Sequence, residues 1–86
     1  GIHDAQYRLG RLYAAGRGVP VDYEYAYGWY SVASHLGNPK AAGARETAAQ
    51  NLTAEQLVEA KKLSEQLITE FGEPVEAHRA TKRLTP

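Results

Sequence analysis

Apolar and polar residues follow one another along most of the chain at the three- and four-residue spacing of amphipathic helices. The pattern predicts four helices, over residues 4–15, 22–36, 39–50 and 54–71. Helix-breaking residues separate them, with Gly16 and Pro20 after the first and Gly37 after the second. The chain is therefore expected to be all-α.

The first predicted helix has two sides that differ in residue type. Ala5, Leu9 and Leu12 recur at helical spacing, so this side is expected to pack against the rest of the domain. The other side is expected to face solvent and carries Tyr7, Arg11 and Ala14, with Arg8 at its edge.

The second predicted helix is rich in aromatic residues. Its inner side is expected to hold Tyr23, Ala26, Trp29, Tyr30, Ala33 and Leu36, and its solvent side Glu24, Gly28, Ser31 and His35. The tyrosines at 23, 25 and 27 alternate as in a strand, but the helical spacing continues for two more turns. We therefore predict a helix, with the side chain of Trp29 buried in the hairpin.

The third and fourth predicted helices have clear starts. Asn38 is a good N-cap and Pro39 suits a first helical position. Thr53 and Gln56 have the spacing of a capping box, and an amphipathic helix follows them. The apolar periodicity fades after residue 72, so residues 73–86 are expected to form a flexible C-terminal tail.

The chain contains an internal repeat. Gly1 and Ala5 recur as Gly37 and Ala41, 36 residues later. Each half holds two helices joined by a short loop. The expected units are a helical hairpin over residues 1–37 and a second, degenerate hairpin with a capping helix over residues 38–72.

The first hairpin resembles a Sel1-like repeat, a relative of the tetratricopeptide repeat. The matching positions are Asp4, Ala5, Gln6, Tyr7, Leu9, Gly10, Leu12, Tyr13, Gly16, Gly18, Val19, Asp22, Ala26, Trp29, Ala33 and Gly37. The second hairpin departs from the pattern, because Arg45 and Glu46 replace the Leu-Gly pair and the glycine loop is missing. The resemblance implies tandem antiparallel hairpins in a short right-handed α-solenoid.

Composition narrows the possible functions. Ten basic and ten acidic residues give no basic footprint for nucleic acid. No apolar run reaches the ~20 residues that insert into a membrane, and the chain has no cysteine. It also has no methionine and begins at Gly1, so we expect a fragment or a processed form, and the sequence leaves the compartment open.

Catalytic, metal and cofactor sites are not expected. Gly16 and Gly18 lack the preceding strand and the Gly-Lys-Ser/Thr of a phosphate loop. His3, His35 and His78 lie in different segments, without the three or four converging ligands of a zinc site. No serine has a histidine and a carboxylate arranged around it.

The resemblance implies a non-catalytic adaptor or scaffold that binds a protein or peptide, and it favours a bacterial source. One alternative is a structural C-terminal cap of a longer array. Another is a β-lactam-binding hydrolase, although the best-known examples in the family are rich in paired cysteines, which this chain lacks.

The expected binding site is a groove lined by the first and third helices, as in other solenoids of stacked hairpins. It would gather Tyr7, Arg8, Arg11, Ala14 and Arg45 into a positive, partly aromatic floor for a peptide with carboxylates. An open apolar flank around Ile2 and Leu9 also predicts weak self-association through the first helix.

Overall fold

The computed structural model describes residues 2–72, with only the backbone of Ile2. These residues form four helices: α1 (Ile2–Ala15), α2 (Tyr23–His35), α3 (Ala41–Ala49) and α4 (Ala54–Phe71). The described residues form no strand, so the all-α prediction is confirmed and the strand alternative for the tyrosines is wrong. The predicted tail, residues 73–86, lies outside the described residues.

Side-chain caps are predicted at the N-termini of α2, α3 and α4, and the structure has them at α2 and α4. Asp22 accepts hydrogen bonds from the backbone N–H groups of Glu24 and Tyr25, both at 3.1 Å, at the start of α2. Thr53 and Gln56 form the reciprocal capping box of α4. α3 begins two residues later than predicted, because Asn38 accepts from the Lys40 N–H at 2.9 Å and so caps a turn before the helix.

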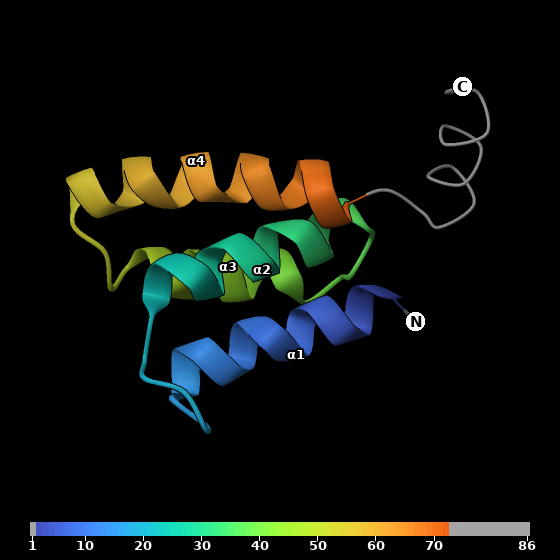
Figure 1. Cartoon of the computed structure of the whole chain (residues 1–86), viewed down its shortest axis with the longest axis horizontal. Coiled ribbons are helices and arrows are strands. Elements are labelled where there is room, and N and C mark those ends of the chain that lie inside the picture. Colours follow the sequence, from blue (N-terminus) through green and yellow to red (C-terminus); the bar gives the residue numbers. More distant parts are fainter. Residues whose placement is uncertain (1, 73–86) are drawn as a thin grey trace.

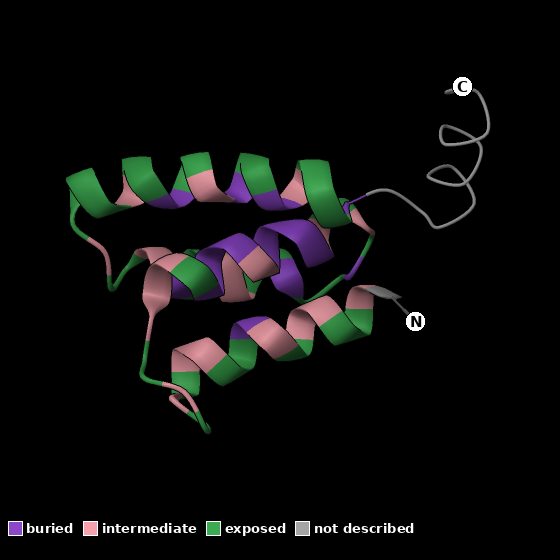
Figure 2. Cartoon of the chain, viewed as in Figure 1, coloured by how far each residue is buried: buried purple, intermediate pink, exposed green. Residues whose placement is uncertain are grey.

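Helix α2 lies at the centre of the fold. α1 and α3 run in one direction and α2 and α4 in the other, as expected for tandem hairpins (Figure 1). The helix pairs that pack closely are α1–α2, α2–α3 and α2–α4. Burial is accordingly concentrated on α2, while the outer side of α4 is exposed (Figure 2). The fourth helix thus packs mainly on α2 rather than on α3, its partner in sequence.

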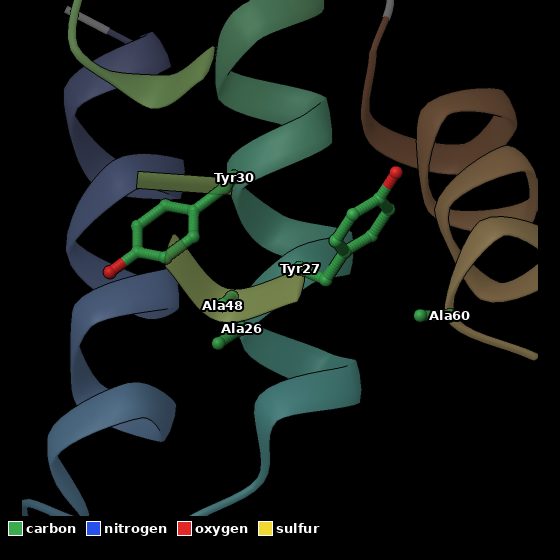
Figure 3. Close-up of a cluster of buried hydrophobic side chains, with 5 residues drawn as sticks. All are labelled: Ala26, Tyr27, Tyr30, Ala48 and Ala60. Carbon is green, nitrogen blue, oxygen red and sulfur yellow. The ribbon is translucent and has the colours of Figure 1, made fainter. Parts of the chain in front are cut away.

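The core is a cluster of small and aromatic residues from three helices: Ala26, Tyr27 and Tyr30 of α2, Ala48 of α3 and Ala60 of α4. Tyr30 points toward α1 and Tyr27 toward α4, with Ala48 between them in the view of Figure 3. The alanines allow the helix backbones to approach, and the two tyrosine rings fill the remaining space.

Two glycines lie where neighbouring helices approach each other closely. A Cβ atom on Gly10 of α1 would lie 2.6 Å from carbons of the Tyr30 ring, and one on Gly28 of α2 would lie 2.8 Å from a methyl group of Leu67 in α4. Gly28 and Ser31 are therefore buried, and their predicted place on a solvent side of α2 is wrong. The helical wheel fails here because α2 has neighbours on several sides.

Trp29 does not lie where the sequence analysis placed it. Its side chain is half-buried beside Phe71 of α4, with ring centroids 5.2 Å apart, and Phe71 is itself exposed. Tyr30, 5% exposed, occupies the interface between α1 and α2 instead.

Candidate functional site

The side of α1 that packs against α2 is the one predicted to face solvent. Tyr7 is half-buried, with its ring centroid 5.5 Å from that of Tyr30, and Ala14 also packs against the core cluster. Tyr7, Gly10 and Ala14 follow the same three- and four-residue spacing as the apolar stripe. The wheel overlooked this side because its closest contact is a glycine, which has no side chain to count.

The opposite side of α1 is open and forms the candidate site. An arginine-lined depression of about 390 Å³ is bounded by Arg8, Arg11, Leu12, Ala15 and Arg17. All five residues are exposed, and Leu12 retains 37% of its accessible surface. The lining therefore combines three positive charges with two apolar residues and contains no carboxylate.

The loop after α1 positions the third arginine. Gly16 has a positive φ of 69° and Gly18 one of 79°, a conformation in which glycine avoids the strain that a Cβ atom would cause. Gly16 follows the last residue of α1, and Arg17 lies between the two glycines and lines the depression. The glycine loop thus contributes to the charge of the candidate site.

No salt bridge within the described part of the chain includes an arginine of the depression, although the positive charge of Arg8 acts on the carboxylate of Asp4. Lys62 Nζ lies 3.6 Å from Glu59 Oε1, and His3 Nδ1 lies 3.4 Å from Asp4 Oδ1. Arg11 nevertheless affects Tyr30. Burial raises the pKa of the Tyr30 phenol, Tyr7 adds to the rise, and the positive charge of Arg11 opposes it.

Arg45 lies apart from the depression. It is half-buried on α3, with its guanidinium carbon 5.9 Å from the centroid of the Tyr27 ring, in a cation–π arrangement. Its Nε is buried without a hydrogen-bond partner among the described residues. Of the predicted set, Arg8 and Arg11 lie in one depression, while Tyr7, Ala14 and Arg45 lie elsewhere.

Sequence analysis missed three residues of the depression: Leu12, Ala15 and Arg17. The helical spacing places Leu12 on the side expected to pack, and Arg17 lies in the glycine loop after the first helix, where the spacing gives no indication of its position. The signal that could have found them is the spacing of Tyr7, Gly10 and Ala14, which turns Leu12 and Ala15 outward once it is taken as the packed side.

The described histidines do not form a metal site. His3 Nδ1 lies 3.3 Å from Asn38 Nδ2 and 3.4 Å from Asp4 Oδ1, while His35 is exposed. Within residues 2–72 no group of three or more possible metal ligands comes together. None of the helices in this part of the chain is long and apolar enough to cross a membrane.

Comparison with known proteins identifies the repeat family of the first hairpin. Residues 3–38 match the family model of the Sel1 repeat. The chain carries a Sel1 repeat. A solved structure with an SLR fold, c5321, a protective antigen of uropathogenic Escherichia coli strains, shares 34% sequence identity with a TM-score of 0.79. Among curated proteins the search found no match.

The family-model match and the solved structure with an SLR fold confirm the resemblance to Sel1-like repeats and the helical-repeat fold. The solved relative matches 98% of this chain, but the chain spans only 18% of that longer protein. Sel1 repeats are generally protein-interaction modules and are typically non-catalytic. The E. coli relative agrees with the bacterial source that the resemblance favoured.

Proposed function

We propose that this chain is a non-catalytic adaptor module that binds a protein partner through the arginine-lined depression on α1. The observation that carries the proposal is the lining itself, three exposed arginines around Leu12 and Ala15 with no carboxylate among them. Arginine combines a charged, planar head with an apolar stem and is enriched at binding hot spots. The preferred partner surface is therefore acidic with an apolar centre.

The proposal revises the groove expected from the sequence. Arg8 and Arg11 keep their predicted binding role. Tyr7 and Ala14 act in support, because they pack α1 onto the core, and Arg45 takes no part because it is held against Tyr27. The partner would be attracted by charge over a distance of about a Debye length, so binding should weaken as salt rises.

Affinity capture with matched variants tests the proposal. A partner captured from cells and then purified should bind Arg8→Ala and Arg11→Ala variants more weakly by about 1–2 kcal/mol each, the range for an exposed anchor. Helicity by circular dichroism should stay unchanged. The controls are Lys61→Ala and Lys62→Ala, each of which removes one exposed positive charge from α4. Equal losses for both pairs would mean that net charge, not the depression, governs binding.

Thermal shift measurements test the non-catalytic part. We expect no saturable change in Tm with zinc, nucleotides or β-lactams. Specific binding at a hundredfold excess over Kd would stabilise the fold by about 2.7 kcal/mol, which is easily detected. A clear shift with any of these ligands would contradict this part of the proposal.

A further inference from the structure

The first turn of α1 meets the turn between α2 and α3, where the first hairpin passes into the second (Figure 1). His3 Nδ1 lies 3.3 Å from Nδ2 of Asn38, 35 positions later, and 3.4 Å from Oδ1 of Asp4. The His3 side chain is 36% exposed, whereas Asn38 is buried, with 7% exposed. One solvent-accessible ring nitrogen therefore has a buried amide and a carboxylate within reach.

The turn fixes which end of the Asn38 amide faces His3. Asn38 Oδ1 accepts a hydrogen bond from the backbone N–H of Lys40 at 2.9 Å, so the amide nitrogen, a donor, is directed at the ring. The ring nitrogen that receives this bond must be an acceptor, which assigns the neutral ring with its proton on Nε2. The contact with Asn38 therefore exists only for neutral imidazole.

Protonation reverses the hydrogen-bonding preference of the same nitrogen. In the imidazolium ion both ring nitrogens are donors, so Nδ1 no longer accepts from Asn38. The carboxylate of Asp4 offers the opposite chemistry, because it only accepts. The pKa of Asp4 is lowered, first by a hydrogen bond and the charge of the terminal amino group and further by His3 and Arg8. Asp4 is therefore ionised when an imidazole takes up its proton.

We propose that His3 is a pH-sensitive switch, which binds the turn between the hairpins when neutral and exchanges Asn38 for Asp4 when protonated. Histidine is the side chain whose charge changes between about pH 5 and 8. Release leaves the buried amide nitrogen of Asn38 without this partner, which destabilises the contact. Mild acid should therefore loosen the attachment of α1 to the second hairpin, while the helices stay formed. The contact lies outside the arginine-lined depression, so the two proposals stand independently.

The residues near this contact supply the controls. Arg8 lies on α1 and Lys40 in the turn, and side chains of these two types keep their charge where histidine titrates. His35, exposed at the end of α2, is the other histidine of the described residues, so its effect must be separated from that of His3. Asn51 is an internal reference, because its Nδ2 donates at 3.1 Å to the backbone carbonyl of Thr47, which does not titrate.

Nuclear magnetic resonance of the labelled chain follows the ring and the amide separately. At neutral pH the ring nitrogen shifts of His3 should show the proton on Nε2. As the pH falls from about 8 to 5, the side-chain amide protons of Asn38 should exchange with solvent about fivefold faster relative to those of Asn51, as expected when one hydrogen bond is lost. This change should have the same midpoint as the titration of the His3 ring.

Three variants separate the exchange of partners from a general effect of acid. His3→Gln has no group to titrate and should make the ratio of Asn38 to Asn51 exchange independent of pH. His35→Gln, the matched change on α2, should leave the response as in the parent. Asp4→Asn removes the carboxylate that accepts from the protonated ring, so the midpoint should move to lower pH by up to about half a unit.

A proton on Nδ1 of the neutral His3 ring would contradict the proposal, because Asn38 could not then donate to it. Equal changes at Asn38 and Asn51 while the ring titrates would mean that the protonated ring keeps its contact. A response that disappears in His35→Gln would assign the effect to the wrong histidine, and an unchanged midpoint in Asp4→Asn would exclude the exchange of partners. Circular dichroism should be the same at both ends of the titration, and a loss of helicity would replace local release by unfolding.

Discussion

The two hairpins share a repeat but differ in how closely their own helices pack. In the first, Gly10 lets the Tyr30 ring of α2 lie directly against the backbone of α1. In the second, Glu46 stands at the place of Gly10 and is exposed, and α4 packs on α2 at Gly28 instead. The hairpin with a glycine at this position thus has its two helices in close contact, whereas in the hairpin with a glutamate there the second helix packs mainly on α2.

The same difference explains where the open surface lies. The core cluster that α2 forms with α3 and α4 includes Ala48 of α3, and Tyr7 and Ala14 of α1 pack against it. On the opposite side of α1, Ala5, Arg8 and Leu12 are exposed in the part of the chain that the structure describes and form an open stripe. The surface proposed for binding thus follows from the central place of α2, rather than from a special motif.

The largest effect should come from the aromatic residue that closes the first hairpin. Tyr30→Ala should reduce the free energy of unfolding by about 3–5 kcal/mol, the range for a buried large aromatic side chain. A domain of this size has a total stability on the order of 5–10 kcal/mol, so this variant should be largely unfolded at moderate urea concentration.

The repeat supplies the control for this change. Ser64 is the equivalent residue of α4, 34 positions later, and its hydroxyl only donates to the Ala60 carbonyl of its own helix at 2.7 Å. Ser64→Ala should cost less than about 1 kcal/mol. Equal losses in urea titrations followed by circular dichroism would mean that both hairpins close in the same way.

A smaller loss is expected when the glycine contact itself is filled. Gly10→Ala places a methyl group 2.6 Å from the buried Tyr30 ring. Overpacking of this kind costs about 1–3 kcal/mol, partly offset by the ~1 kcal/mol better helix propensity of alanine. Gly43→Ala in α3 meets nothing within 4 Å and should instead stabilise by about 1 kcal/mol. If both substitutions stabilise, Gly10 does not set the hairpin contact.

The helices and their caps could be predicted from sequence because their signals are local. The capping box at Thr53 and the cap at Asp22 act within four residues, and both are present. The side of each helix that packs could not be predicted in the same way, because it depends on neighbouring helices, about which a helical wheel of one segment carries no information. Gly10 and Gly28 lie at close contacts between helices, yet they have no apolar side chain that a hydrophobic pattern could reveal. For this reason the helical spacing predicts that Tyr7 faces solvent and Leu12 packs inside, the reverse of what the structure has.

Weak self-association is expected from the open stripe of α1. The exposed patch is small, so sedimentation equilibrium should give a Kd on the order of 1 mM, about 4 kcal/mol of binding free energy. Leu12→Glu should abolish the association, and Val58→Glu should not, although Val58 is the more exposed of the two at 53% against 37%. An ideal monomer up to millimolar concentration would show that the open stripe is too small or too charged to pair with another copy.

The smallest expected effect is a loss of stability at alkaline pH, which arises from Tyr30 in the first hairpin. Burial, reinforced by Tyr7, raises the pKa of Tyr30 above the ordinary 10.0, and Arg11 only partly opposes the rise. The folded state thus favours the neutral phenol. Below about pH 10 both states hold this proton and the contribution is fully present. As the pH rises further, the unfolded chain ionises first, and stability falls until the folded pKa is passed.

Tyr30→Phe isolates this contribution. The variant keeps the ring that lies against Gly10 and Tyr7 but has no group to ionise. Its urea midpoint should therefore decline less between about pH 9 and 11 than that of the parent. At the equivalent place the second hairpin has Ser64, which does not titrate in this range, so it offers no matching loss. Parallel declines for parent and variant would place the alkaline sensitivity outside the contact between α1 and α2.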